Sequence, residues 1–184
     1  MLVNVTGATE LFTYTFLHAG AKAALTAAES SEEGQAYNLL NVLVLSSFLV
    51  EAYFNHLGNL KGFVAWSDKK DRTSVWNKYK FLREAVGLEK LSINEAYPAV
   101  DAAIEFRNEM AHGRTSTYNF SQDVLWSSGG VLPPKIPVGW QLALNLKDVK
   151  CCFDASRKLI LELHEQAGLG GRPFTKMAST QLRF

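Results

Sequence analysis

Cysteine, proline and net charge are all scarce in this sequence of 184 residues. Its two cysteines, Cys151 and Cys152, are adjacent, so they cannot build the disulfide framework of a small secreted protein. We therefore expect a reduced, cytoplasmic setting. The 19 Lys and Arg residues nearly balance the 18 Asp and Glu residues. This balance excludes a histone-like protein that binds nucleic acid through bulk positive charge.

Long apolar runs are also missing. The most apolar stretch, residues 39–50, is interrupted by Asn41 and two serines and is followed by Glu51. We expect no membrane span there, because the stretch is too short and too polar. No Lys or Arg precedes Lys22, so the basic start of a secretory signal is not expected either.

Helical periodicity dominates the sequence and predicts an all-α protein, an antiparallel bundle of about five helices in a single domain spanning residues 1–184. The predicted helices cover approximately residues 8–28, 32–57, 72–86, 92–113 and 146–167. The second is apolar on all sides in its middle, which is typical of a central buried helix. In the fourth, Ser92 and Glu95 fit a capping box, and Pro98 predicts either a kink or a later start.

Residues 114–145 differ from the rest, because they are rich in glycine and proline and alternate in polarity at both ends. They predict a small β-hairpin or a packed irregular loop, inserted before the last helix. Loops of this length in a small domain are often functional. Residues 172–184 are predicted to form a flexible tail.

The most informative stretch for chemistry is residues 107–113. On a helical wheel, Arg107 falls within the apolar arc of the fourth helix, whereas Asn108 and His112 lie on its polar edge. An arginine in an apolar arc needs a partner, a ligand or a water-filled cleft. Glu51 is the best candidate partner, with Asn55 one turn further along the same helix. The alternative is an arginine that packs its stem in the core and extends its charge to the surface.

His112 lies in the last helical turn, where the helix dipole favours the protonated imidazole. A histidine near its ordinary pKa exchanges protons at neutral pH, so His112 is a candidate general acid or base. The alternative is a histidine that only caps the last carbonyl groups. Arg107 and His112 are about 140° apart around a straight helix. Pairing two copies of the helix across a symmetry axis would bring both side-chain types into one cleft.

An arginine, a polar residue and then a histidine at the end of a helix in a small bundle resemble the motif of the HEPN superfamily (higher eukaryotes and prokaryotes nucleotide-binding domain). Arg107, Asn108 and His112 match this motif, and the helices from about residue 32 to residue 167 are compatible with its bundle. Glu51 on an earlier helix and the helix stop at Gly113 add to the resemblance.

The resemblance implies a metal-independent endoribonuclease of bacterial toxin or defence type, which acts as a homodimer and needs no cofactor or metal. The RNA would supply its own nucleophile, the 2′-hydroxyl. Arg107 would hold the scissile phosphate, His112 would act as general acid or base, and Asn108 would orient one of them. An antitoxin or another protein is the second implied partner.

Two other readings remain open. Some members of the superfamily have lost the activity, so the chain is alternatively a catalytically silent helical module that binds a nucleotide, RNA or a protein. The third reading is a purely structural helical protein in which the motif occurs by chance.

Residues 67–90 form the most basic region, with seven Lys and Arg residues against four Asp and Glu residues. With Trp66 and Trp76 beside these charges, the region could track an RNA backbone and stack a base. The alternative is a solvated helix face with both tryptophans in the core. The candidate RNA-binding residues are Lys69, Lys70, Arg72, Lys78, Lys80, Arg83 and Arg114.

No spacing of Cys or His residues predicts a metal site. The remaining histidines are scattered, and only His56, beside Asn55, is placed to approach the cleft.

Overall fold

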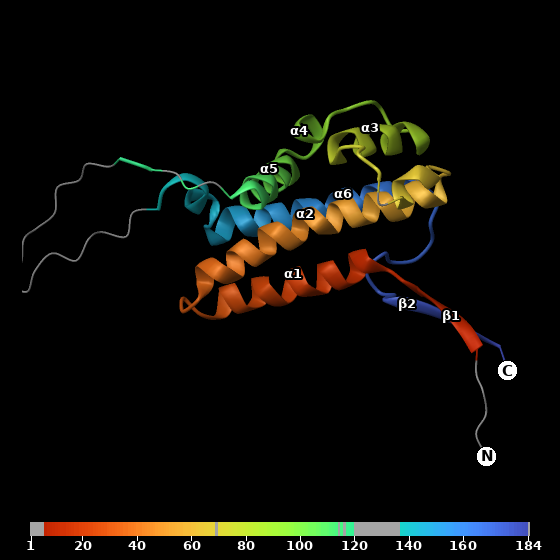
Figure 1. The fold of residues 1–184 in the computed structure, drawn as a ribbon, viewed down its shortest axis with the longest axis horizontal. Coiled ribbons are helices and arrows are strands. Elements are labelled where there is room, and N and C mark those ends of the chain that lie inside the picture. Colours follow the sequence, from red (N-terminus) through yellow and green to blue (C-terminus); the bar gives the residue numbers. More distant parts are fainter. Residues whose placement is uncertain (1–5, 69, 114, 116, 120–136, 184) are drawn as a thin grey trace, which may run out of the picture.

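One long helix, α2 (Gln35–Leu60), runs through the middle of the structure (Figure 1). The computed structural model describes residues 6–183, apart from residues 69, 114, 116 and 120–136. Packed along α2 are α1 (Thr13–Ser30), α5 (Pro98–His112) and α6 (Leu146–Gln166), and α3 (Val75–Ala85) also packs against it. The described chain is therefore an all-α helical bundle with one small two-stranded sheet, which confirms the predicted fold class. In Figure 1, α1 and α5 run antiparallel to α2, whereas α6 runs in the same direction as α2.

The position of α2 confirms the prediction of a central helix. Its buried apolar side chains are Leu39, Val42, Leu43, Leu49, Val50, Tyr53, Phe54 and Leu57. Among the described helices, α2 is long and apolar enough to cross a membrane by length and composition alone. Half of its most apolar window is buried against the other helices, as in the core helix of a globular bundle.

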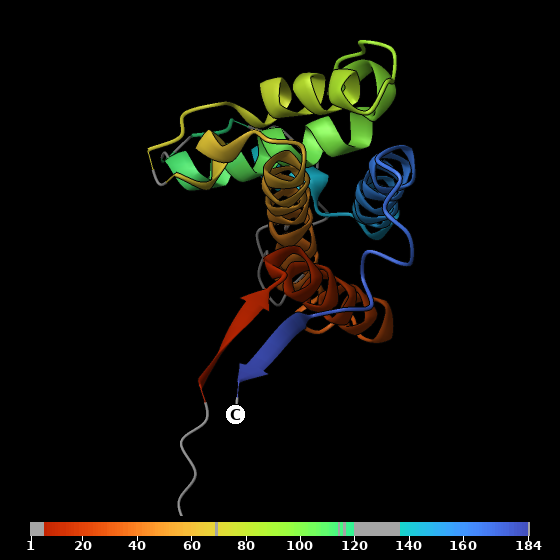
Figure 2. The same cartoon turned by 90° about the vertical axis from the view of Figure 1, so that its right-hand side faces the viewer.

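One side of α2 is not covered by another helix. Figure 2 looks along the bundle and shows α1, α5 and α6 around three sides of α2. The uncovered side and the adjacent side of α1 form what we call the open face. Its exposed residues are Phe16, Ala23 and Ala27 on α1 and Tyr37, Asn41 and Phe48 on α2. Exposed aromatic side chains gathered on one face are typical of an interaction surface.

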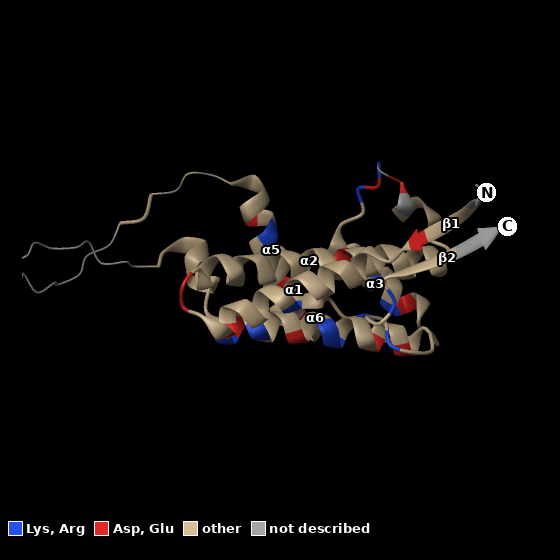
Figure 3. Cartoon of the chain, turned by 90° about the horizontal axis from the view of Figure 1, so that it is seen from below, with Lys and Arg blue, Asp and Glu red and all other residues tan. Residues whose placement is uncertain are grey.

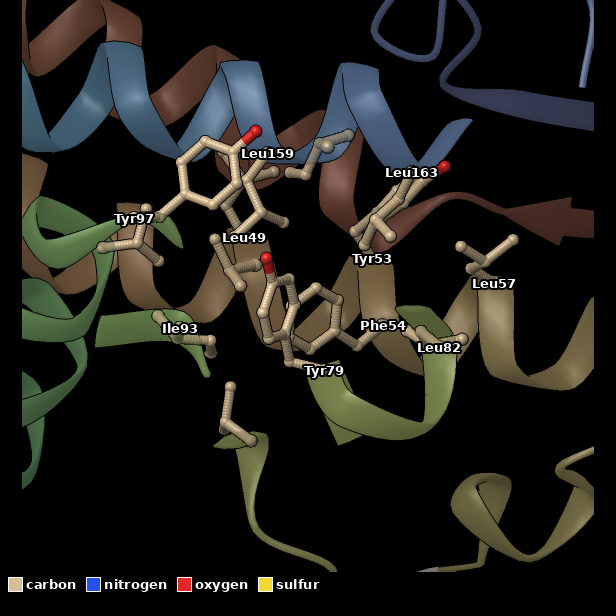
Figure 4. Close-up of a cluster of buried hydrophobic side chains, with 14 of the residues drawn as sticks. Leu49, Tyr53, Phe54, Leu57, Tyr79, Leu82, Ile93, Tyr97, Leu159 and Leu163 are labelled. Atoms are coloured by element: carbon tan, nitrogen blue, oxygen red, sulfur yellow. The ribbon is translucent and has the colours of Figure 1, made fainter. Parts of the chain in front are cut away.

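The core has two connected parts, which lie towards opposite ends of α2. The part at its C-terminal end joins α2 to α3, α4 (Ile93–Ala96) and α6, and Figure 4 shows how their side chains meet. Tyr53, Phe54, Tyr79 and Leu82 are fully buried there. The other part joins α1, α2, α5 and α6 and includes small residues such as Ala21, whose size lets α1 and α2 approach closely.

The predicted fourth helix is divided at Pro98. The capping box between Ser92 and Glu95 starts α4, with the Ser92 hydroxyl accepting from the Glu95 amide at 3.2 Å. Pro98 then takes the first position of α5, where its missing amide hydrogen costs no helical bond. Pro98 therefore marks a later start, one of the two outcomes that the sequence left open.

Both ends of the described chain differ from the sequence prediction. Strand β1 (Thr6–Leu11) pairs antiparallel with β2 (Ala178–Arg183), so residues 8–11 are not helical and the predicted tail contains a strand. The pairing joins segments about 170 residues apart in sequence, with Thr9 opposite Thr180 and their hydroxyl groups 3.1 Å apart. A local pattern carries little information on such a long-range pairing, which explains the error.

The predicted hairpin or loop of residues 114–145 lies largely outside the described residues. Its described end contains the short 3₁₀ helix η2 (Gly139–Ala143) rather than a strand. Trp140 packs the edge of its ring system against Phe106 of α5, with ring centroids 6.4 Å apart. This contact fixes the approach to α6.

A stack of aromatic rings attaches the segment after α6 to α1. The His18 ring lies between Phe153 of α6 and Phe174, with ring centroids 5.5 and 4.1 Å away. Burial, assisted by the nearby charges of Arg157 and Lys22, lowers the pKa of His18 to about 4. His18 is therefore neutral in the folded protein down to about pH 4, whereas in the unfolded chain it takes up a proton near its ordinary pKa of about 6.5.

We predict that the melting temperature falls as the pH is lowered from 6.5 towards 4, because the unfolded state binds a proton in this range that the folded state excludes. Replacing His18 with Phe keeps the stacked ring and removes the titration, so it should flatten part of this fall. Circular dichroism melts of both proteins at several pH values measure the effect. Asp71 does not interfere with this measurement. Its hydrogen bond with Lys78 lowers the carboxyl pKa to about 2, so its contribution to the stability of the fold is lost only at pH values below those at which His18 acts. Equal slopes for the two proteins between pH 6.5 and 4 would contradict the prediction.

Candidate active site at the contact between α2 and α5

Arg107 of α5 reaches across to α2 and pairs with Glu51. Its Nη2 donates to Glu51 Oε2 at 3.1 Å, as the sequence analysis predicts. The guanidinium carbon lies 5.0 Å from the centre of the Phe48 ring, one turn earlier on α2. The side chain of Arg107 is 16% exposed and that of Glu51 is 29% exposed, so the pair is only partly shielded from water.

The guanidinium is held firmly but is not saturated. One nitrogen bonds Glu51, and Nε is buried without a hydrogen-bond partner in the described part of the chain. Guanidinium carries five N–H donors in a fixed plane, suited to two oxygens of a carboxylate or phosphate. Arg107 is therefore fixed in orientation at the edge of the open face, and its Nη1 has no hydrogen-bond partner among the described residues, whereas Nε is buried.

His112 is the last residue of α5 and is exposed. The helix ends at Gly113, whose amide donates to the carbonyl groups of Glu109 and Met110 at 3.1 and 3.3 Å. Because α5 stays helical through His112, the angular separation from Arg107 remains about 140°. One chain therefore does not bring these two side chains together. Asn108, next to Arg107, is half-buried.

Asn55 lies one turn after Glu51 on α2 and belongs to a different set of contacts. Its Oδ1 accepts from Nζ of Lys78 at 2.8 Å, and the same ammonium contacts the Asp71 carboxylate at 2.6 Å. The Lys78 side chain is only 4% exposed, and its ammonium also lies 5.6 Å from the centre of the Trp66 ring. Lys78 is therefore a buried bridge between α3, α2 and the loop before α3, not an RNA-binding surface residue.

Arg83 is likewise buried rather than available to RNA. Its Nε donates to the Glu89 carbonyl at 2.6 Å, and Nη1 donates to the Tyr79 hydroxyl at 3.0 Å. Nη1 also lies 3.5 Å from the Glu162 carboxylate, which accepts from the Tyr97 hydroxyl at 2.9 Å. Arg83 thus joins α3 to α6. The helical period places both basic residues on the inner side of α3, which wheel analysis of residues 75–85 could have shown.

The remaining candidate RNA-binding residues fall into two groups. Lys70, Arg72 and Lys80 are exposed and remain available to a ligand, whereas Lys69 and Arg114 lie outside the described residues. Trp66 is buried, and the indole of Trp76 donates to Asp101 of α5 at 2.5 Å. Both tryptophans therefore have structural contacts, and base stacking on them has no support here.

Comparison with known proteins finds no match. No family model, curated protein or solved structure matches the chain. Within the described residues, no group of three or more His, Cys, Asp or Glu side chains is arranged to hold a metal ion.

We predict that Arg107 and Glu51 are energetically coupled. A double-mutant cycle with Arg107→Ala and Glu51→Ala, measured by urea unfolding, should give a coupling free energy on the order of 1 kcal/mol, since the pair is partly desolvated. The control pair is Lys90 and Glu84, which lie 3.0 Å apart but are 69% and 57% exposed. Water screens such a pair, so its coupling should be close to zero. Similar coupling in both cycles would show that Glu51 does not hold Arg107.

Proposed function

We propose that this chain is a metal-independent endoribonuclease of bacterial toxin or defence type, as the resemblance to the HEPN superfamily implies. The observation that carries the proposal is the partly exposed guanidinium of Arg107, which is fixed by Glu51 and Phe48 and whose Nη1 has no hydrogen-bond partner among the described residues. An arginine held in this way is suited to bind a scissile phosphate and to stabilise the negative charge of its transition state.

The reaction needs few protein groups. The 2′-oxygen of the RNA attacks the adjacent phosphorus and loses its proton to a general base. The bond from phosphorus to the 5′-oxygen breaks, and a general acid protonates that oxygen. The products are a 2′,3′-cyclic phosphate and a 5′-hydroxyl. Exposed His112 serves as one of the two proton-transfer groups, and Arg107 binds the non-bridging oxygens.

A homodimer supplies the arrangement that one chain lacks. Arg107 and His112 point to different sides of α5, so a composite site takes Arg107 from one copy and His112 from the other. The open face supports self-association because it combines exposed Phe16, Tyr37 and Phe48 with few charges. Figure 3 shows the charged residues gathered mainly on α6 and around α3, with few on α1 and α2. A face without strong charge of one sign can meet its own copy without repulsion.

The second candidate is a silent module that binds RNA or a protein partner. The exposure of His112 at a helix end favours it, because a histidine in this position can also serve only as a helix cap. The experiments below distinguish the two candidates.

We predict that the purified protein cleaves RNA in the presence of EDTA. His112→Ala should lower the cleavage rate roughly 10²- to 10⁴-fold by removing proton transfer. Arg107→Ala should lower it roughly 10²- to 10³-fold by removing charge stabilisation. Glu105→Ala, an exposed carboxylate of the same helix, is the matched control and should cleave like wild type. The readout is the appearance of cyclic phosphate ends on labelled RNA.

If the wild-type protein binds RNA or a protein partner but leaves all tested RNA substrates intact, the silent module is favoured. Equal cleavage by all four proteins would indicate a contaminating nuclease and remove the assignment of this site.

We further predict that mixing the Arg107→Ala and His112→Ala proteins restores activity. In a composite dimer, each mixed dimer contains one intact site and one doubly damaged site. After exchange of subunits, a 1:1 mixture should reach about a quarter of the wild-type rate. Light scattering on the same samples measures the oligomeric state. A mixture no more active than its components would show that the two residues do not come from different copies.

A further inference from the structure

A polar pocket of about 220 Å³ lies where the start of α1 meets the C-terminal half of α2. Figure 1 shows these two helix ends side by side near strand β1. Its lining includes Phe12, Thr13, Tyr14, Asn55, His56 and Asn59. None of the candidate catalytic residues lines it, so it is a feature separate from the Arg107 contact. Its size suits a small planar group rather than a drug-sized molecule.

Asn55 lines this pocket, and its amide is held by a hydrogen bond to Lys78. An ammonium group only donates, so the bond from Lys78 sets Oδ1 towards the lysine and leaves Nδ2 on the other side. Nδ2 has no protein acceptor among the described residues. Asn59, one turn later on α2, is exposed and adds a second amide with both a donor and an acceptor. Lys78, which is itself held by Asp71, thus sets the orientation of the Asn55 amide.

The pocket favours a neutral ligand over an anion. Its lining contains no Lys or Arg, and burial is the main cause that lowers the pKa of His56, which keeps this imidazole uncharged at neutral pH. The wall beside the amides is built from rings. The centroids of Phe12 and Tyr14 lie 5.4 and 5.0 Å from that of His56. The ammonium of Lys176 lies 5.7 Å from the centre of the Phe12 ring and occupies one of its faces. We therefore assign the choice of ligand to the side-chain amides of Asn55 and Asn59 and not to this ring.

We propose that this pocket binds a single nucleobase through its hydrogen-bonding edge. Paired donors and acceptors of side-chain amides match the edges of bases, and proteins read unpaired RNA bases in this way next to aromatic side chains. Asn55 lies four residues after Glu51, about 6 Å further along α2. Asn55, which lines the pocket, and Glu51, which holds Arg107, are therefore neighbours on α2. The assignment of that base to an RNA strand rests on the proposed nuclease function, whereas base binding itself does not.

The test titrates the full chain with each of the four nucleoside 5′-monophosphates and with ribose 5-phosphate, followed by ¹⁵N NMR. At least one nucleotide should saturably shift the amide signals of residues 12–14 and 52–59, and ribose 5-phosphate should not. Asn59→Leu should weaken binding about threefold to tenfold, the equivalent of one lost hydrogen bond. Asn94→Leu, the same change at an exposed position of α4, should leave binding unchanged.

Asn55→Asp is the second variant. It keeps an oxygen facing Lys78, so the fold is retained, but it replaces the donor with an acceptor and should abolish or change the base preference. The outcome that overturns the proposal is an absence of pocket shifts with all four nucleotides at about 10 mM, where even millimolar affinity is visible. Equal shifts with ribose 5-phosphate would also overturn it, since the phosphate would then be the ligand.

Arg107→Ala separates the two proposals. It should lower RNA cleavage, whereas the pocket shifts caused by a nucleoside, which has no phosphate for Arg107 to bind, should be unchanged. Nucleotide binding without any cleavage by wild type would sustain the pocket and end the nuclease proposal. Cleavage without nucleotide binding would end the pocket proposal alone.

Discussion

Burial of α2 on three sides is the constraint on which the rest of this structure depends. Its leucine, valine and aromatic side chains contact α1, α3, α5 and α6, and Leu49, Tyr53, Phe54 and Leu57 are fully buried. Each such side chain contributes roughly 1.5–3 kcal/mol relative to its exposed state. Helices α1, α3, α5 and α6 have α2 as their common partner, whereas α4 packs on α5 and α3. A helix fixed this rigidly along its length is also a good scaffold for a site.

The polar residues of α2 use that rigidity. Glu51 holds Arg107 of α5, Asn55 accepts from Lys78 of α3, and the Tyr53 hydroxyl lies 3.0 Å from Nδ1 of His164 on α6. Three neighbouring helices are thus bonded to residues 51–55 of α2. These bonds add geometric precision to an interaction whose energy is mainly hydrophobic. The residues proposed to hold phosphate and base are positioned by the same short stretch.

The sequence predicted much of this arrangement because the information was local. Helical periodicity located the five main helical segments, and Ser92 with Glu95 marked the start of α4. The Arg107–Glu51 pair was predictable because a charge in an apolar arc requires a partner. The pairing of β1 with β2 was not predictable, since strand pairing at long separation depends on where the helices place the two ends of the chain. The prediction that Lys78 and Arg83 lie on an RNA-binding surface was wrong, because it used the number of basic residues in the region and not their positions around the helix.

The burial of Lys78 and Arg83 also changes what the near-neutral charge means. Their charges are met inside the bundle by Asp71 and Glu162, so they add little to the field outside the protein. Of the described basic candidates, Lys70, Arg72 and Lys80 remain at the surface. A chain with so few surface cations in that region gains little from counterion release along a nucleic acid. Its selectivity for RNA would therefore have to come from placed groups, a guanidinium for one phosphate and amide edges for one base, rather than from bulk attraction.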